Sequence, residues 1–458
     1  MRFLLFVFIL AIISCDAVRA QDASGTIYVK SIQLSGNKKT KRSVVLRELS
    51  LREGAIIAKD SLANLQELSR LRLMNIQLFN EVKVEWVAEA ADTMSMYIAV
   101  LERFPIMPDP HFEFADRNFN VWWSEQKRDL RRLNLGLTLV HRNFRGNREQ
   151  VSATAQVGYT QKFGFAYERP FLDEQQKHGM GFSISGLQNK EIAYKTDTNK
   201  LHFYRDLNHA MLRQSQFSLW YTYRPEYAST HKLTASYQHY WIADTIAALN
   251  PEYLGGGNMQ EDVLMLNYFY RYNNVDNWEY PLLGSRVVGY FNQLYAFKNK
   301  TAQSIFYLQI DKYANPWKRW YVSAIFRGRV SFAQRQPYIF RKNLGYDFDY
   351  IRGYEYYVVD GDAFAMLRLN LKRELLNVKI HLPIPYFQVV PLRVYGKVYA
   401  DGGVAHSKYQ INDRIVDKPM YAAGLGLDIV TLYDIKVRIE YTLNRMGEKA
   451  LYLHKSGE

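Results

Sequence analysis

Residues able to act as catalysts or metal ligands are present in this 458-residue chain, but they are scattered. Its ten histidines form no HExxH pattern and show no other metal-ligand spacing. Gly424-Leu425-Gly426 lacks the third glycine and the following helix of a phosphate-binding loop, and Gly255-Gly256-Gly257 is more typical of a flexible loop. The sequence therefore predicts no enzyme, no metal and no cofactor, with a hydrolase as the least favoured alternative.

The direction of one acidic side chain, that of Asp401, can be predicted from its neighbours. It continues a polar row at odd positions, Arg393, Tyr395, Lys397 and Tyr399, which alternates with Leu392, Val394, Gly396 and Val398. Because successive side chains of a strand point to opposite faces, Asp401 belongs to the polar face. Among cations there, a guanidinium can hold this carboxylate through two parallel hydrogen bonds.

The elements that must position such residues fall into two regions, the first of which covers residues 25–102. It shows a strand over 27–34, helices over 43–49 and 60–77, and strands over 82–86 and 94–100. This order, β-α-α-β-β, predicts one small α+β domain. Residues 103–131 are expected to form an irregular connector, because Pro105, Pro108 and Pro110 interrupt regular structure.

From residue 132 to residue 458 the pattern changes to alternation with period 2. Leu133, Leu135, Leu137 and Leu139 alternate with Asn134, Gly136 and Thr138. Few segments are left to build the facing sheet of a soluble sandwich. About sixteen segments of about ten residues can each cross a bilayer at a tilt, and an even number closed into a ring leaves no open edge. The prediction is an all-β transmembrane barrel of about sixteen antiparallel strands.

The N-terminus predicts export. Residues 3–13 form an apolar run with the size of a signal-peptide core, and Val18-Arg19-Ala20 is a small-x-small cleavage site, so residues 1–20 are expected to be removed. Alternatively, Ile12-Ile13-Ser14-Cys15 resembles a lipoprotein box, in which Cys15 would be lipidated. Cys15 is the only cysteine, so no intramolecular disulfide can form.

The chain is basic, with 59 Lys and Arg residues against 45 Asp and Glu residues. An exported protein rarely meets nucleic acid, so anionic lipid head groups, acidic clients or a basic lumen explain the excess better, beside a basic surface with no specific partner. If the small domain is periplasmic, odd-numbered strands run outward. The long segments 243–262 and 334–362, after the seventh and eleventh strands, then lie on the outer side.

Several short segments resemble one family. The small domain is similar to a POTRA (polypeptide-transport) domain at Ser35-Gly36-Asn37, Arg47-Glu48-Leu49, Gly54 and 78–82. Segments 143–147, 167–172 and 276–284 resemble recurring pieces of the BamA/TamA surface-antigen superfamily. Ile351-Arg352-Gly353-Tyr354 is similar to its (V/I)RG(F/Y) loop signature, and Tyr399-Ala400-Asp401-Gly402-Gly403 to its F-x-D-x-G strand motif.

The resemblance implies a sixteen-stranded barrel whose first and last strands pair weakly and template client strands. Here that seam is expected to join 133–143, with Leu133, Leu135 and Leu137, to 449–454, with Leu451 and Leu453. The resemblance also implies that the signature loop folds back into the lumen and brings Arg352 to Asp401. Gly353 would allow a tight turn beside the wall, and Tyr354 could pack against it.

Three features depart from the family pattern. Only one POTRA unit is present, which indicates a specialised or accessory member. Tyr399 replaces the phenylalanine of the strand motif, and the chain ends without the common terminal phenylalanine.

The function predicted on this basis is assembly or insertion of outer-membrane proteins, or translocation of polypeptides, with the POTRA domain docking clients or partners. The alternative is a solute channel or structural barrel with a docking domain. Expected partners are unfolded outer-membrane or surface polypeptides, outer-membrane lipid, and periplasmic chaperones or accessory lipoproteins, but no nucleic acid. The expected location is the bacterial outer membrane, with the N-terminal domain in the periplasm.

Overall fold

The computed structural model describes residues 25–116, 119–346, 348–381, 389–410, 413–431 and 436–454. The predicted signal peptide, with Cys15, lies outside these residues. The chain divides into two compact units, a smaller one that ends at Arg103 and a larger one that runs from Phe104 onward and also takes in Lys39–Lys41. Within the described part of the chain, no helix is long and apolar enough to cross a membrane.

The smaller unit is a four-stranded sheet with two α-helices. In chain order its elements are β1 (Thr26–Ser35), α2 (Arg42–Glu48), β2 (Ile56–Ala58), α3 (Leu62–Asn75), β3 (Phe79–Ala90) and β4 (Thr93–Glu102). The sheet order is β2-β1-β4-β3, with β1 parallel to β4. The core contains Val29 and Met96 from the sheet and Leu73 from α3, all fully buried. The order β-α-α-β-β is present, and the three-residue strand β2 is an addition that no periodicity could have indicated.

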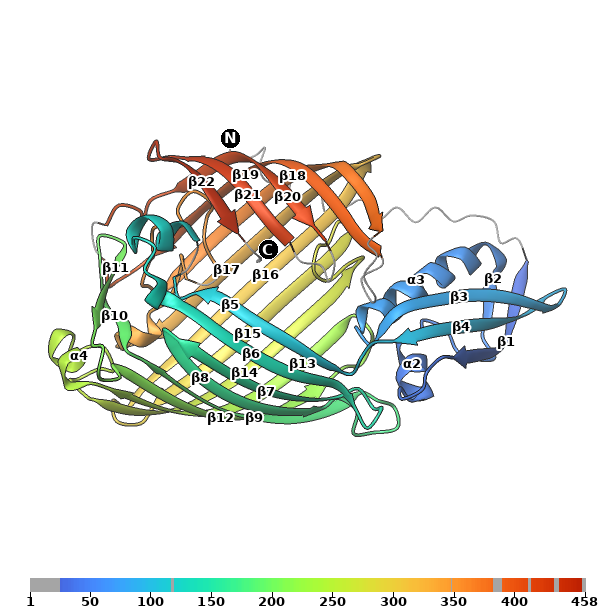
Figure 1. The fold of residues 1–458 in the computed structure, drawn as a ribbon, viewed down its shortest axis with the longest axis horizontal. Coiled ribbons are helices and arrows are strands. Elements are labelled where there is room, and N and C mark those ends of the chain that lie inside the picture. Colours follow the sequence, from blue (N-terminus) through green and yellow to red (C-terminus); the bar gives the residue numbers. More distant parts are fainter. Residues whose placement is uncertain are drawn as a thin grey trace. The chain divides into compact units, whose positions relative to one another are not determined.

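The larger unit is one sheet of sixteen strands, each antiparallel to its neighbours and arranged in chain order. Its strands are β5 (Ile106–Phe114), β6 (Leu133–Phe144), β7 (Glu149–Gly158), β8 (Thr160–Arg169), β9 (His178–Asn189), β12 (Leu212–Tyr223), β13 (Ser229–Ile242), β14 (Gln260–Val275), β15 (Gly284–Ala296), β16 (Thr301–Trp317), β17 (Trp320–Ala333), β18 (Ala363–His381), β19 (Val389–His406), β20 (Met420–Val430), β21 (Lys436–Asn444) and β22 (Lys449–His454). A separate hairpin, β10 (Glu191–Asp197) with β11 (Lys200–Arg205), lies between β9 and β12. Figure 1 shows the tilted strands curling around a lumen.

The two faces of this sheet have the polarity that lipid requires. On β21, Arg438, Glu440 and Thr442 are at most 3% exposed, whereas Tyr441 and Leu443 are about half exposed. A soluble protein would bury the apolar row and expose the charged one. Here the apolar row faces outward over strand after strand, and the polar row lines the lumen, which is the arrangement of a transmembrane barrel.

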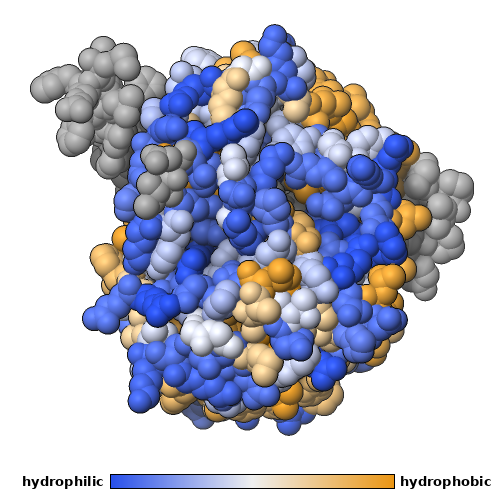
Figure 2. All heavy atoms as spheres, turned by 90° about the vertical axis from the view of Figure 1, so that its left-hand side faces the viewer, coloured by the Kyte–Doolittle hydropathy of each residue, from blue (hydrophilic) through white to orange (hydrophobic). Residues whose placement is uncertain are grey.

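The connections are long at one end of the barrel and short at the other. Segment 243–259, with the short helix α4 (Asp244–Leu249), follows the seventh strand, β13, and segment 334–362 follows the eleventh, β17. At the opposite end, β16 and β17 are joined by Lys318 and Arg319 alone. Figure 2 shows the end that bears α4 and the β10–β11 hairpin as a mainly hydrophilic face, with hydrophobic residues gathered toward its margins.

The expectation of an irregular connector over 103–131 is wrong, because the first barrel strand, β5, lies within it. Leu133 begins the second strand, not the first. Pro108 and Pro110 do not interrupt this strand, because proline is tolerated on an edge strand wherever the missing N–H would point away from the neighbour. The segment also holds a short helical turn, Val121–Glu125, whose Trp122 is buried against Phe114 and Phe119.

Strand parity predicts the sidedness of the protein. An epitope tag inserted after Gly257, where the surroundings are open, should be labelled on intact cells. A tag inserted at Ala91, in the exposed turn between β3 and β4, should be labelled only after the outer membrane is permeabilised. Labelling of the Ala91 tag on intact cells would contradict this topology.

Candidate functional site

The long segment 334–362 folds into the barrel lumen and contributes to a buried apolar cluster there. Ile351, Tyr354 and Val359 of this segment are at most 3% exposed. They pack with lumen-facing residues of the strands, namely Phe364 and Met366 of β18, Ala405 of β19, and Met420 and Ala422 of β20. This packing holds the segment against the inner wall and positions Arg352, the residue between Ile351 and Gly353.

That residue, Arg352, is bound to Asp401 of β19. Its Nε and Nη2 donate to the two carboxylate oxygens at 2.8 and 2.5 Å, and its backbone N–H donates to Oδ2 at 3.1 Å. The two side chains are 2% and 0% exposed. The guanidinium also lies over the ring of Tyr399, 3.8 Å from the centroid. A bidentate charged pair stacked on an aromatic ring has a single well-defined geometry.

The pair belongs to a larger buried network that crosses four strands. Arg352 Nη1 donates to Asn370 on β18 at 2.8 Å and to Glu440 on β21 at 3.2 Å. Glu440 also pairs with Lys397 of β19 at 2.7 Å, and Lys397 pairs with Asp428 of β20 at 2.5 Å. Buried charges are tolerated only when they are paired, so each link here depends on the others.

Gly353 allows the segment to approach the wall closely. Its φ is +86°, and a Cβ atom would lie 2.9 Å from Cγ2 of Thr442 and 3.2 Å from Cβ of Asn444. Its carbonyl accepts a hydrogen bond from Asn444 Nδ2 at 2.7 Å. Glycine is therefore required both by the backbone conformation and by the space available.

The same segment contacts the last strand, β22. The ring of Tyr350 stacks on His454 with the centroids 5.4 Å apart, and Tyr356 lies against Tyr452. His454 Nε2 is 3.6 Å from Glu355 and 3.4 Å from Glu440. The lumen loop is thus linked to the strand at the end of the sheet.

The structure distributes the predicted seam residues differently from the expectation. Leu451 and Leu453 lie on β22, the last strand, and are 61% and 39% exposed on its outer face. Leu133, Leu135 and Leu137 lie on β6, where they alternate outward but pair with β5 on one side and β7 on the other. The first strand of the sheet is β5.

Sequence reasoning did not assign Asn370, Lys397, Glu440 or His454 to the site. A partial signal was present, since Lys397 and Glu440 lie in polar rows of period 2 and carry opposite charges. Periodicity indicates which face a residue lies on but not its neighbours across strands. Among the described residues, no group of three or more His, Cys, Asp or Glu side chains has the geometry of a metal site.

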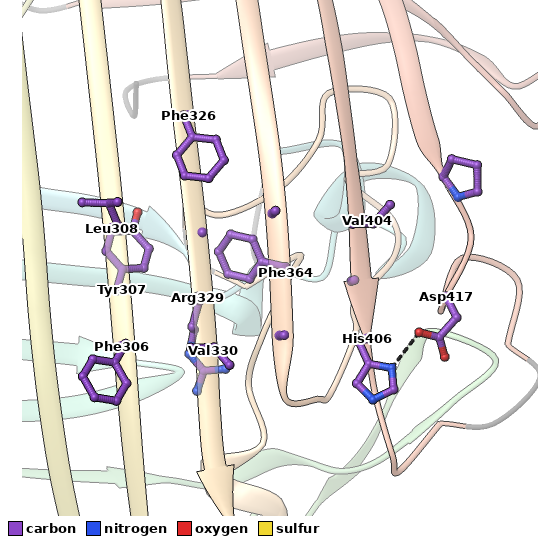
Figure 3. A pocket seen from close by; sticks show the side chains of 15 residues that line it. Phe306, Tyr307, Leu308, Phe326, Arg329, Val330, Phe364, Val404, His406 and Asp417 are labelled. Atoms are coloured by element: carbon purple, nitrogen blue, oxygen red, sulfur yellow. Dashed lines mark hydrogen bonds and ion pairs between the residues drawn. The ribbon is translucent and has the colours of Figure 1, made fainter. Parts of the chain in front are cut away.

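An apolar hollow of about 780 Å³ lies on strands β16 to β19. Phe306, Leu308 and Phe326 line it from the outward face, around the space left by Gly328 and Ala365 (Figure 3). At one end, His406 is hydrogen-bonded to Asp417 at 2.7 Å. Its outward residues belong to the row that faces lipid.

Comparison with known proteins matches both units. Residues 27–103 match the POTRA family described as surface antigen variable number repeat. The fold is similar to that of BamA from Haemophilus ducreyi lacking POTRA domains 1–3, with a TM-score of 0.53 and 13% identity over 94% of this chain and 83% of that chain. It is also similar to CdiB from Acinetobacter baumannii (TM-score 0.51, 10% identity, 93% of this chain and 73% of that chain). CdiB from Escherichia coli gives 0.50 and 12%, over 94% and 74%. No curated protein matches the chain by sequence.

The Arg352–Asp401 pair predicts a measurable coupling. Arg352→Ala and Asp401→Ala should each destabilise the folded loop by roughly 3 kcal/mol, because each leaves a desolvated charge with weaker partners. The double variant should lose less than the sum, by about 1–3 kcal/mol. Thermal unfolding and limited proteolysis of segment 334–362 in the purified protein would measure this.

Arg335→Ala is the matched control. Arg335 lies in the same segment and pairs with Glu252, but its side chain is 67% exposed, so its loss should change stability little. Additive losses for Arg352 and Asp401 would mean that the two residues are not coupled.

Proposed function

Because the chain has the fold of the BamA/TamA-like superfamily, with a POTRA domain before the barrel, we propose that it inserts or translocates polypeptides at the bacterial outer membrane. The POTRA domain would lie in the periplasm and receive clients or accessory partners. The barrel would provide the pathway for client strands through its seam. The proposed activity requires no chemical catalysis by the protein.

The observation that carries this proposal is the weak final strand of the barrel. Within the part of the chain that the structure describes, β22 has six residues, whereas its fellow strands β18 and β19 have 19 and 18. Both β5 and β22 stand at the ends of the sheet order, each with one neighbouring strand in that order. An edge with few ladder hydrogen bonds opens at low cost and can pair with another chain.

The segment folded into the lumen supports a polypeptide-handling role over the alternative of a solute channel. The Arg352 network and the cluster around Ile351 and Tyr354 occupy the interior. At the end with the long connections, the tip of the β10–β11 hairpin is fixed by Asn199, which is fully buried. Its backbone and side chain are hydrogen-bonded to Val358, and its side chain also accepts from Ile415. A diffusion channel needs neither a segment packed inside its lumen nor a hairpin fixed at one end.

The POTRA domain offers a docking edge. β3 has twelve residues and stands at one end of its sheet, so an extended segment of a client, a chaperone or an accessory lipoprotein could pair with it. Outer-membrane lipid is the other expected partner, because the hollow beside Phe306 and Phe326 is apolar and wide enough for acyl chains.

Depletion of the protein tests the proposal. Quantitative proteomics of the outer membrane should show loss of particular barrel or surface proteins, which would then be the clients. An unchanged outer-membrane proteome together with a steady, wide, ion-selective conductance of the purified protein in planar bilayers would favour the solute channel instead.

A disulfide across the seam provides a second prediction. Cysteines at Phe112 on β5 and Leu451 on β22, with neighbouring registers scanned, should abolish client assembly when oxidised and restore it when reduced. The barrel should stay folded, as judged by heat-modifiable migration on gels.

The control disulfide joins Phe112 to Leu135, which are directly opposite each other on β5 and β6. This pair of strands does not have to separate, so oxidation should leave assembly unchanged. Full activity with the β5–β22 disulfide quantitatively formed would contradict the role of the seam.

A further inference from the structure

The two end strands of the barrel present different backbone edges. In the β5–β6 ladder, Arg142 N–H donates to the carbonyl of Pro105 at 3.0 Å, and Ala115 N–H donates to that of Arg132 at 2.7 Å. Hydrogen-bonded pairs alternate along an antiparallel ladder, so the odd residues of β5 bond to β6. The even residues, Ile106, Pro108, Pro110, Phe112 and Phe114, therefore direct their backbone groups toward the other edge.

The edge of β5 that points away from β6 is consequently poor in hydrogen-bond donors. Pro108 and Pro110 occupy two of its five edge-facing positions, and proline has no N–H. An incoming strand would find carbonyl acceptors there but would miss two successive donors. Prolines at such positions are a known means of preventing edge-to-edge pairing.

The edge of β22 is intact by the same reasoning. Asn444 N–H donates to the carbonyl of Glu448 at 3.1 Å, so the even residues of β22 bond to β21. Lys449, Leu451 and Leu453 direct their N–H and C=O groups to the outer edge, and none is a proline. This edge retains its full set of donors and acceptors.

Part of the β22 edge is covered by a side chain from the loop after β5. Asn120 Nδ2 donates to the carbonyl of Leu451 at 2.5 Å, and Asn120 Oδ1 accepts from Leu453 N–H at 3.3 Å. One side-chain amide thus bonds to one acceptor and one donor of the edge. These are groups to which a neighbouring strand would bond.

The loop that carries Asn120 is held independently of β22. Glu125 accepts from Lys200 of β11 at 2.7 Å, and Asp129 is bound to Arg205 of β11 at 2.9 Å. Trp122 Nε1 donates to the Asp129 carbonyl at 3.0 Å. These anchors allow the two Asn120 hydrogen bonds to break without unfolding of the loop.

We propose that the edge of β22, and not that of β5, is where an extended polypeptide first pairs with this barrel, and that Asn120 occupies the edge until the polypeptide displaces it. This assignment rests on the proposed function and identifies its docking site. The fitting partner is a strand of alternating apolar and polar residues, because Leu451 and Leu453 face lipid while Tyr452 and His454 face the lumen.

Peptide capture by the purified full-length protein tests the assignment. The probe is a synthetic peptide with the sequence of β20, an alternating strand of this sheet, carrying one cysteine. Disulfide formation is compared between Leu453→Cys on β22 and Phe112→Cys on β5. Capture at Leu453→Cys should exceed that at Phe112→Cys severalfold.

Asn120→Ala should raise capture at Leu453→Cys by roughly tenfold, the effect expected when two competing neutral hydrogen bonds are lost. Asn120→Asp, which keeps only the acceptor, should give an intermediate gain. Ser124→Ala, an exposed position on the same helical turn, is the matched control and should change nothing. Heat-modifiable migration verifies that each variant is folded.

Restoring donors to β5 is the converse experiment. Pro108→Ala combined with Pro110→Ala should raise capture at Phe112→Cys. The assignment is overturned if Phe112→Cys captures as much peptide as Leu453→Cys in the native background, or if Asn120→Ala gives no gain. If capture follows the prediction while depletion leaves the outer-membrane proteome unchanged, the edge assignment stands and the proposed cellular function fails.

Discussion

The larger unit depends on one constraint: within lipid, no water is present to bond the backbone edge of a sheet. Fourteen of the sixteen strands meet this constraint by pairing on both sides, and the burden falls on the two end strands, β5 and β22. The chain manages the two edges by different means. On β5, prolines stand where N–H donors would point away from β6, and on β22 a side-chain amide bonds to part of the edge. Unpaired backbone edges of the large sheet are thus limited to these two strands.

The same constraint also makes the polarity of the sheet the reverse of that in a soluble protein. As a result, charged side chains in the lumen need partners. Apolar side chains must face lipid, so charged rows face inward, where segment 334–362 removes water from them. A desolvated charge without a partner is costly, and the lumen accordingly holds a closed set of ion pairs centred on Arg352, Asp401 and Glu440. Because Glu440 also lies near His454, the electrostatics of the lumen extend to the end strand. Segment 334–362 and the end strand β22 are therefore in direct contact, so that a change in one affects the other.

These two features suit a barrel that handles polypeptides better than one that conducts solutes. A channel gains from an open lumen and a wall that is paired throughout, whereas this protein has a segment folded into its lumen and a sheet with two end strands. The hairpin β10–β11, braced through Asn199, Lys200 and Arg205, adds a closure at one end and also holds the loop that carries Asn120. The loop, the hairpin and the end strand β22 form one connected set of contacts, while each strand from β6 to β21 pairs with a neighbour on both sides.

Alternation of period 2 by itself determined the barrel, its lumen face and the direction of Asp401, because side-chain direction in a strand is a local property. Mixed periodicity likewise indicated the small domain, apart from the three-residue strand β2. Arg352 was singled out only by resemblance, since a loop has no period to read. Tertiary structure alone decided which strand is first, because the prolines at 108 and 110 break an inner strand but are harmless at an edge. It also decided the partners: Asn120 and Leu451 are 331 residues apart, and no local pattern relates two positions that only the closing of the sheet brings together.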